Sequence, residues 1–227
     1  MNKNGFTLSE VLITLGVIGV VLAITMPILI KNYQRFITVK KLKSSYSVFA
    51  QALQRSVADN GDIRTWDRSN PRLYAEKYFN MYLKGVNKSS NYYVTSLHYP
   101  THNNLYWYQS GNYPIYELPN GITFIVRDGI GTASRYIVIM VDINGSKKPN
   151  IVGKDVFAFL SYMDNPDRLD GFCVRGESRD AVKNNGLTGA HYSACSKTVK
   201  GVNSFAGLCC AGLIMHDGWK IKDDYPW

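Results

Sequence analysis

Residues 1–30, MNKNGFTLSEVLITLGVIGVVLAITMPILI, decide the fold of this 227-residue chain. The twenty residues from Val11 to Ile30 carry no charged side chain. An α-helix of that length, at about 1.5 Å rise per residue, crosses a hydrocarbon core of about 30 Å. We therefore expect a membrane-spanning helix near the N-terminus, with one acidic residue, Glu10, at its edge.

The features before this apolar run do not have the order of a secretory signal peptide. A signal peptide places its small residues and its cleavage site after the apolar segment. Here the small residue, Gly5, comes before that segment. Cleavage after Gly5 would therefore leave the hydrophobic helix on the mature protein.

This order resembles the type III signal of type IV pilins and pseudopilins. The resemblance rests on Gly5, Phe6, Thr7, Leu8, Ser9 and Glu10, and on Gly16, Gly19 and Pro27 within the apolar run. It implies that a membrane-bound prepilin peptidase cuts after Gly5 and methylates Phe6. It also implies that Glu10 pairs with the N-terminal amine of a neighbouring subunit when subunits assemble on an inner-membrane platform.

The physical chemistry of the segment agrees with that resemblance. A carboxylate at the centre of a membrane helix costs about 2.5 to 3.5 kcal/mol on insertion scales, so Glu10 should have a partner. An ordinary single-span anchor needs only apolar length and has no use for this acid. Gly16 and Gly19 permit close approach of another helix, and Pro27 removes one helical hydrogen bond and favours a bend.

The helix is predicted to continue beyond the membrane, as one element over about residues 6–58. Its apolar positions recur at spacings of three and four: Phe36, Val39, Leu42, Tyr46, Phe49, Leu53 and Val57. This spacing is typical of an amphipathic helix with one buried face. Asn60 and Gly61 supply a stop signal. The alternative is a break at Pro27 followed by a separate surface helix.

Short apolar runs later in the chain predict an antiparallel sheet. Residues 116–118 and 122–126 flank Pro119-Asn120-Gly121, a hairpin turn, and residues 136–141 and 156–160 predict two further strands. We expect an α+β fold, in which the long helix packs on a small antiparallel sheet. Its parts are a leader at 1–5, a membrane and polymerisation helix at 6–30, its amphipathic continuation at 31–60, and a head at 61–227.

Aromatic residues are frequent between Ile63 and Glu117. The run RLYAEKYFNMYLK predicts a short helix, and the following aromatic stretch predicts loops and short strands. Exposed rings there would form a face for binding a protein or a sugar, whereas buried rings would fill the core of the head. Near the C-terminus, Trp219, Tyr225 and Trp227 are expected to pack the tail on the head.

All four cysteines, Cys173, Cys195, Cys209 and Cys210, lie in the last quarter of the chain. If the head is exported, this placement favours disulfide bonds within a loop-rich C-terminal region. The vicinal pair is the least favourable, because adjacent residues meet disulfide geometry only with strain. Cys195 is expected to bond to Cys209 or Cys210, and Cys173 to the other.

A turn at Asp142-Ile-Asn144-Gly, with Asp155 downstream, resembles the β-region turn of pilin-like and pseudopilin heads. By that resemblance, Asp142, Asn144 and Asp155 would offer oxygen ligands to calcium. The spacing departs from an EF-hand loop, and a plain turn closed by local hydrogen bonds is the alternative. We expect no other cofactor.

The charge of the chain leaves two points open. Its net charge of +9 is compatible with binding to nucleic acid or anionic lipid, and equally with a solvated surface. Basic residues follow the apolar run at Lys31, Arg35, Lys40, Lys41 and Lys43, whereas only Lys3 precedes it. Counting of positive charges would place the head in the cytoplasm. The motif at residues 5–10 implies the opposite orientation, with a cytoplasmic N-terminus and a periplasmic or extracellular head.

The chain carries no nucleophile-elbow, zinc-protease or phosphate-binding motif. We therefore expect a structural protein rather than an enzyme. The predicted function is that of a structural subunit of a type IV pilus or a type II secretion pseudopilus. Its partners would be copies of itself and related pilins, prepilin peptidase and the inner-membrane assembly platform. The alternative is a minor pilin on the same scaffold that binds DNA or an adhesion ligand.

Overall fold

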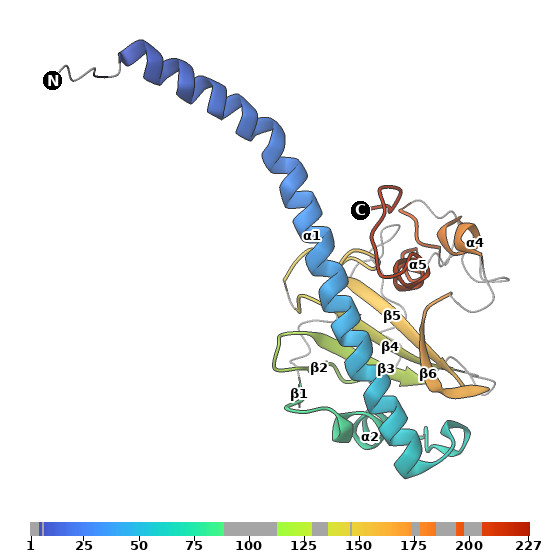
Figure 1. The fold of residues 1–227 in the computed structure, drawn as a ribbon. Coiled ribbons are helices and arrows are strands. Elements are labelled where there is room, and N and C mark those ends of the chain that lie inside the picture. Colours follow the sequence, from blue (N-terminus) through green and yellow to red (C-terminus); the bar gives the residue numbers. More distant parts are fainter. Residues whose placement is uncertain are drawn as a thin grey trace. The chain divides into compact units, whose positions relative to one another are not determined.

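The computed structural model describes residues 5, 7–88, 113–128, 136–145, 147–173, 178–184, 194–197 and 206–227. The chain divides into two compact units, residues 1–38 and residues 39–227. Figure 1 shows their secondary structure, and each unit is described by itself.

Helix α1 (Leu8–Asn60) is continuous over 53 residues and belongs to both units. It includes Pro27, so the alternative of a helix that breaks at this residue is wrong. Membrane-type helices tolerate proline because neighbouring groups satisfy the freed carbonyl. The helix ends where predicted: Gly61 adopts a φ of 72°, and its N–H donates to the carbonyl of Val57 at 2.9 Å.

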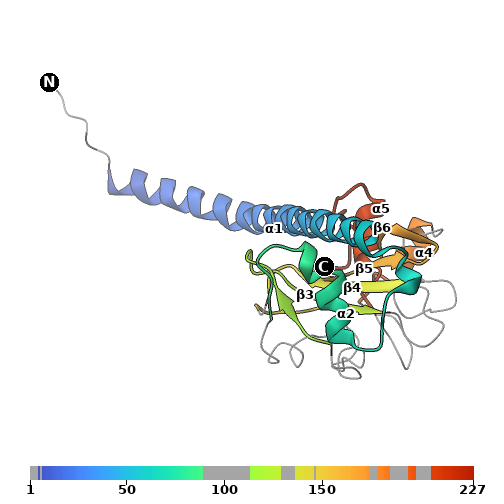
Figure 2. The ribbon, with the colours of Figure 1, turned by 90° about the horizontal axis from the view of Figure 1, so that it is seen from below.

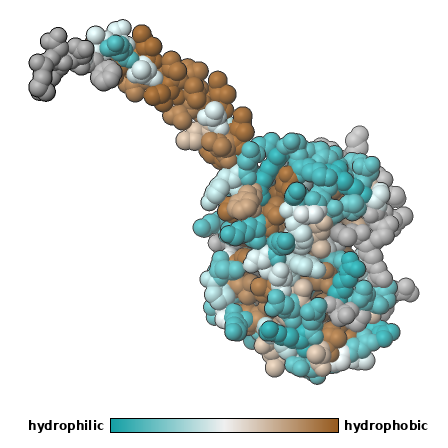
Figure 3. Space-filling model, viewed as in Figure 1, coloured by the Kyte–Doolittle hydropathy of each residue, from teal (hydrophilic) through white to brown (hydrophobic). Residues whose placement is uncertain are grey.

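The first unit exposes its apolar side chains. Leu8, Leu12, Ile18 and Ile28 are 78%, 61%, 53% and 59% exposed. Figure 3 shows the corresponding hydrophobic surface over this part of the helix. Among the described residues, α1 is the helix that is long and apolar enough to cross a membrane. This unit therefore has an apolar surface in place of a core.

The second unit buries the other half of α1. The buried positions on this helix are Leu42, Ser45, Phe49, Ala52, Leu53 and Ser56. The Phe49 ring lies 4.9 Å from that of Phe124 in β3, and the Tyr46 ring lies 5.7 Å from that of Phe159 in β5. Figure 2 shows this part of α1 running over the sheet. The predicted packing of helix on sheet is confirmed.

The sheet has six strands in the order β1-β2-β3-β4-β5-β6, and every neighbouring pair is antiparallel. The strands are β1 (Asn87–Lys88), β2 (Tyr116–Glu117), β3 (Thr123–Asp128), β4 (Tyr136–Asp142), β5 (Val156–Tyr162) and β6 (Asn165–Gly171). The two central strands β4 and β5 are buried along nearly their whole length, so both faces of the sheet are covered there.

The predicted hairpin is confirmed by the register of β2 and β3, in which Tyr116 pairs with Phe124. In its turn, the side chain of Asn120 accepts a hydrogen bond from the N–H of Ile122 at 3.2 Å, and Gly121 has a φ of 77°. Strand β6 was not predicted, because its sequence NPDRLDG has no apolar alternation. It forms at the edge of the sheet, where proline and charged residues are tolerated.

The shorter helices are η1 (Ile63–Thr65), α2 (Pro71–Tyr78), η2 (Asn80–Tyr82), α4 (Arg179–Asn184) and α5 (Cys210–His216). The single helix predicted over 72–84 is interrupted at Phe79, whose φ of −130° is not helical. Helix α4 forms within the C-terminal region that was expected to be rich in loops. Helix α5 packs on β5 and β6, as Figure 1 shows.

The aromatic residues that precede the sheet lie in the core. Trp66 stacks on Tyr78 with ring centroids 4.3 Å apart, and Tyr74 and Phe79 are also buried. These rings fill the core of the head, which was one of the two roles predicted for the aromatic residues. The remainder of the aromatic stretch, residues 89–112, lies outside the described residues, so the binding face stays a prediction.

Candidate processing and assembly site

The residues of the predicted cleavage site lie just before the first turn of α1. Gly5 is exposed and lies outside any helix or strand, and the helix begins three residues later at Leu8. Phe6, the predicted site of methylation, lies outside the described residues. The peptide bond after Gly5 therefore comes before the start of α1 at Leu8 in the sequence.

Thr7 and Glu10 close the first turn of the helix with reciprocal hydrogen bonds. The N–H and the hydroxyl of Thr7 both donate to Oε2 of Glu10, at 2.8 and 2.9 Å. The N–H of Glu10 donates in return to the Thr7 hydroxyl at 3.2 Å. This arrangement is a capping box, which satisfies donors that the start of a helix leaves without an internal partner.

The role of Thr7 was not predicted, although its signal is present in the sequence. Thr7-Leu-Ser-Glu10 matches the pattern of a capping box, S/T-x-x-E/Q before an apolar run. The structure therefore gives the Glu10 carboxylate donors within its own chain. An amine from a neighbouring subunit would have to share Oε2 with Thr7, displace it, or bind the other carboxylate oxygen.

The two glycines within the apolar run are not explained by packing within the chain. A Cβ built on Gly16 or on Gly19 would meet no atom within 4 Å. Gly171 shows the contrast, because a Cβ there would lie 2.6 Å from the backbone nitrogen of Gly212 in α5. Small residues at Gly16 and Gly19 leave room for a group outside this chain, as a second helix would require.

Two disulfide bonds join the C-terminal region. Cys173 is bonded to Cys209 and Cys195 to Cys210, with Cα atoms 5.3 and 4.6 Å apart. This settles the pairing that the sequence left open. The adjacent cysteines at the start of α5 are thereby bonded to two separate segments, the residues directly after β6 and the segment at 194–197.

The turn at Asp142 is closed by its own hydrogen bonds. Oδ1 of Asp142 accepts from the N–H of Asn144 at 2.9 Å. Asp155 accepts from the backbone N–H groups of Asn150 and Ile151, at 2.9 and 2.6 Å, and from the side-chain amide of Asn144 at 3.2 Å. Burial raises the pKa of Asp155, and these donors oppose that shift.

These contacts bear on the predicted calcium ligands. The amide nitrogen of Asn144, rather than its oxygen, is directed at Asp155, so the turn is arranged as a hydrogen-bonded loop. Within the described ranges, no group of three or more His, Cys, Asp or Glu side chains is placed to hold a metal ion. The residues do not form a set of converging oxygen ligands, and calcium binding stays a prediction.

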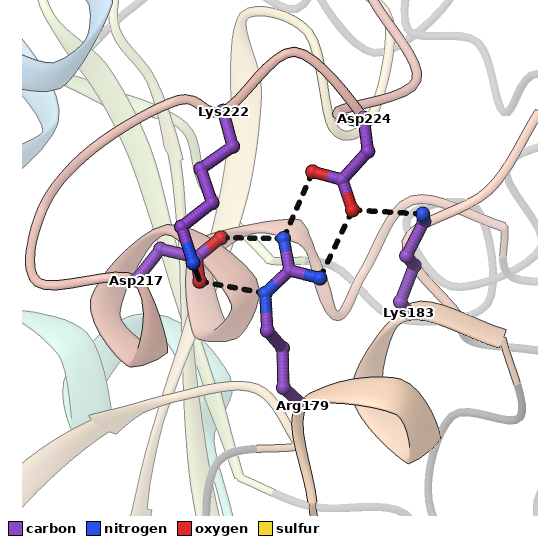
Figure 4. Close-up of polar contacts among 5 residues, drawn as sticks. All are labelled: Arg179, Lys183, Asp217, Lys222 and Asp224. Atoms are coloured by element: carbon purple, nitrogen blue, oxygen red, sulfur yellow. Dashed lines mark hydrogen bonds and ion pairs between the residues drawn. The ribbon is translucent and has the colours of Figure 1, made fainter.

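An ion-pair network, drawn in Figure 4, joins the C-terminal tail to α4. Arg179 lies between Asp217 and Asp224, with nitrogen–oxygen distances of 2.7 and 2.9 Å. Lys222 contacts Asp217 at 2.6 Å, and Lys183 contacts Asp224 at 2.9 Å. We call these five residues the tail clasp.

The basic residues of the tail clasp lower the pKa values of both of its carboxyl groups. Hydrogen bonds from Arg179 and Lys183 hold the pKa of Asp224 well below its usual range. Burial works to raise the pKa of Asp217, but hydrogen bonds from Arg179 and Lys222 outweigh it, and the pKa is lowered. Both carboxylates are therefore ionised in the folded head at neutral pH.

The aromatic residues of the tail pack on the head, as predicted. The buried hydroxyl of Tyr225 donates to the carbonyl of Gly153 at 2.5 Å. The Trp219 ring lies 5.2 Å from that of Tyr46 on α1, and the Trp227 ring lies 5.9 Å from that of Tyr225. The tail is thus fixed by side chains that reach two separate parts of the second unit, the turn at Gly153 and helix α1.

Two models of known families match this chain, one over its N-terminal segment and one over the rest. Residues 1–26 match the model of the prokaryotic N-terminal methylation motif. Residues 28–227 match the model of a family of unknown function, DUF6613. No curated protein and no solved structure matches the chain. The chain therefore belongs to the DUF6613 family, and it begins with the N-terminal methylation motif of type IV pilins and pseudopilins.

Proposed function

We propose that this protein is a structural subunit of a type IV pilus or a type II secretion pseudopilus. Prepilin peptidase cleaves it after Gly5 and methylates Phe6. Before assembly, the segment at 6–30 holds the subunit in the inner membrane, with the N-terminus in the cytoplasm and the head outside. The protein then polymerises through α1, and its role is structural rather than enzymatic.

The observation that carries this proposal is the contrast between the motif-bearing helix and the head. The motif lies at the start of a helix whose large apolar side chains are exposed from Leu8 to Ile30, whereas the head has its own buried core. A surface of that kind requires lipid or other helices around it. The glycines at 16 and 19, which the chain's own packing does not require, support a second helix as one of these neighbours.

Glu10 is the residue on which assembly through this helix should depend. A neighbour's methylated amine would form an ion pair with the carboxylate at the membrane edge, where such a pair is only weakly screened. Thr7 keeps the carboxylate hydrogen-bonded in the single subunit. In this proposal the capping box holds Glu10 in the unassembled protein, and the incoming amine then binds it.

The experiment compares Glu10→Gln with Thr25→Val in cells that assemble filaments. Gln keeps the shape of the side chain and removes its charge. Val removes a hydroxyl from the same apolar segment, where Thr25 donates to the carbonyl of Val21. We expect both variants to enter the membrane and be processed, and Glu10→Gln alone to lose its place in sheared filaments.

The amount of subunit in sheared filaments and in membranes, measured by immunoblot, decides the outcome. Normal filament content for Glu10→Gln would overturn the role of the ion pair. Replacing Gly5 by a larger residue tests the preceding step separately, because it should leave the uncleaved precursor in the membrane. Cleavage at the normal position in that variant would contradict the proposed processing site.

A further inference from the structure

The tail, residues 217–227, ends against one of the two disulfide bonds. Gly153 has no side chain, and a Cβ built on it would lie 2.8 Å from Sγ of Cys210. The same Cβ would lie 2.9 Å from two ring carbons of Trp227. Because these distances start at one point, the Trp227 ring and the Cys210 sulfur are neighbours. The last residue of the chain therefore packs beside the Cys195–Cys210 bond, which we call the tail-side disulfide.

The segment of the other cysteine in this bond also lies near the tail. Lys197, two residues after Cys195, has its amine 5.7 Å from the centre of the Trp227 ring. A cation at this distance from an aromatic face is attracted to it. Cys195 and Cys210 are 1% and 0% exposed. The ring thus lies near the segments of both cysteines of a bond that water does not reach.

Two sets of contacts hold the tail in this place. The buried hydroxyl of Tyr225 donates to the carbonyl of Gly153 at 2.5 Å. Arg179 bonds Asp217, where the tail begins, and also Asp224, directly before Tyr225, as Figure 4 shows for the tail clasp. The tail is therefore fastened at its beginning and again just before its last residues.

Reduction of a disulfide bond requires that a thiolate reach one of its sulfur atoms. The attacking thiolate bonds to that sulfur and releases the other cysteine as a thiolate. The second thiol of a dithiol reagent then closes the reagent's own disulfide and releases the first cysteine, so two electrons pass to the protein. A buried bond reacts from a locally opened state, at a rate that follows the population of that state. Contacts that keep the tail closed should therefore slow this reaction.

Reaction of the tail-side disulfide would also endanger the second bond. Cys209 and Cys210 are adjacent, and Cys209 is bonded to Cys173. A thiolate released at Cys210 that attacked the Cys173 sulfur would form a Cys173–Cys210 bond and release Cys209 as a thiolate. Shielding of the tail-side disulfide therefore protects the pairing of all four cysteines.

We propose that the C-terminal tail is a cover that shields the tail-side disulfide from thiols. The Trp227 ring is the shielding group, and the tail clasp holds the cover in place. Opening of the tail, rather than unfolding of the whole head, sets the rate at which this bond is reduced. The inference goes beyond the proposed function, because it concerns the head and requires neither processing nor assembly.

The test measures reduction of each bond in the folded full-length protein in detergent, with dithiothreitol and without denaturant. Free thiols are alkylated at intervals and identified by mass spectrometry of peptides, so that Cys195 reports the tail-side disulfide and Cys173 the other bond. We expect Trp227→Ala to raise the initial rate at Cys195 about tenfold, which corresponds to about 1.4 kcal/mol of lost packing. The initial rate at Cys173 should change little.

The matched control is Trp219→Ala, which removes the other tryptophan of the tail. Trp219 is also partly buried and also has a lysine near its ring, with the Lys43 amine at 6.0 Å. Its ring packs 5.2 Å from that of Tyr46 on α1 instead of beside the tail-side disulfide. This variant should keep the initial rate at Cys195 close to that of the unchanged protein. Trp227→Phe, which keeps an aromatic ring, should restore most of the protection.

Arg179→Gln tests the same step without changing the ring. Loss of the bonds to two carboxylates should also raise the rate of reduction of the tail-side disulfide, by about tenfold. An unchanged rate in both Trp227→Ala and Arg179→Gln would overturn the inference. Equal acceleration of both disulfide bonds would also overturn it, as would equal acceleration by Trp227→Ala and Trp219→Ala. Either result would show that reduction passes through unfolding of the whole head.

Discussion

Both halves of α1 carry large apolar side chains, but these side chains have opposite surroundings. Leu15 is 60% exposed in the first unit, whereas Leu42 and Leu53 are 0% exposed in the second. The helix itself does not change at the boundary, since its hydrogen bonds run through both parts. The second half of α1 is therefore stabilised by packing on the head of the same chain. The first half needs lipid or other subunits to cover its apolar side chains.

The head gains its stability from three kinds of internal contact. The sheet and helix form the core, the two disulfide bonds join the loops, and the tail clasp holds the C-terminus. None of these lies in the first unit. Substitutions in the head should therefore change its unfolding, whereas substitutions in the first half of α1 should change only processing and assembly.

The largest expected effect on the head comes from Phe49→Ala. Phe49 is fully buried against Phe124, and large-to-small changes of this kind cost about 3 to 5 kcal/mol. The matched change in the first unit, Leu15→Ala, should alter the unfolding free energy of the head by less than about 0.5 kcal/mol. Urea unfolding of the full chain in detergent, followed by near-ultraviolet circular dichroism, checks both. Equal losses would contradict the division into two units.

The second largest loss of unfolding free energy is expected from removal of a disulfide bond. The Cys195–Cys210 bond spans 15 residues and the Cys173–Cys209 bond 36 residues, so loop-closure entropy predicts about 3 and 4 kcal/mol. Double serine variants of each pair, unfolded under the same conditions, measure these losses. Cleavage at Gly5 should be unchanged in both. A processing defect in the serine variants would show that the head and the N-terminal segment are coupled.

A smaller loss is expected for Arg179→Gln. Hydrogen bonds to charged groups contribute about 1.5 to 3 kcal/mol, and Arg179 bonds two carboxylates, one of them on the nearly buried Asp217. We expect a loss of about 2 kcal/mol in urea unfolding. Arg55→Gln, which removes a charge from an exposed position on α1, serves as the control. Equal stability of the Arg179 and Arg55 variants would contradict the role of the clasp.

The clasp also predicts how acid affects the head. The pKa values of Asp217 and Asp224 are lowered in the folded state. Their contribution is therefore present above the ordinary carboxyl pKa of about 4, and it is lost as the pH falls below that value. Thermal unfolding between neutral pH and pH 3 should show a drop that Arg179→Gln reduces. An unchanged acid profile in this variant would refute the assignment.

The smallest expected effect comes from alkali. Burial raises the pKa of Tyr225 well above its ordinary value of about 10, and it raises the pKa of Tyr116 to about 12. Stability from these neutral phenols is present below pH 10 and is lost as the pH rises through their folded-state values. Thermal unfolding should show that the Tyr225→Phe variant is less stable at neutral pH by about 1 kcal/mol. The stability of this variant should fall less steeply above pH 10 than that of the unchanged protein.

The sequence predicted those elements whose signals are local. The helix, its end at Asn60 and the hairpin around Asn120 each depend on residues close together in the chain. The prediction for α2 was too long, because apolar spacing alone does not show that Phe79 leaves the helical conformation. Strand β6 was missed because its partner β5, and not its composition, makes it a strand.

Contacts between distant residues could not be predicted. Arg179 and Asp224 are 45 positions apart and have no periodic pattern that connects them. The disulfide pairing had two equal solutions until the structure brought Cys195 to Cys210. The capping box of Thr7 and Glu10 is the opposite case, because its pattern is local and was present in the sequence.

The most direct test of the account is the chemical identity of the mature N-terminus. Mass spectrometry of the N-terminal peptide, from protein recovered from membranes of cells with prepilin peptidase, should find a chain that begins at Phe6 and carries one methyl group on its amine. Cells that lack the peptidase should contain only the uncleaved chain. A mature N-terminus at any other residue would contradict the proposed processing site, and one beyond Ile30 would also remove the segment through which the subunit is proposed to polymerise.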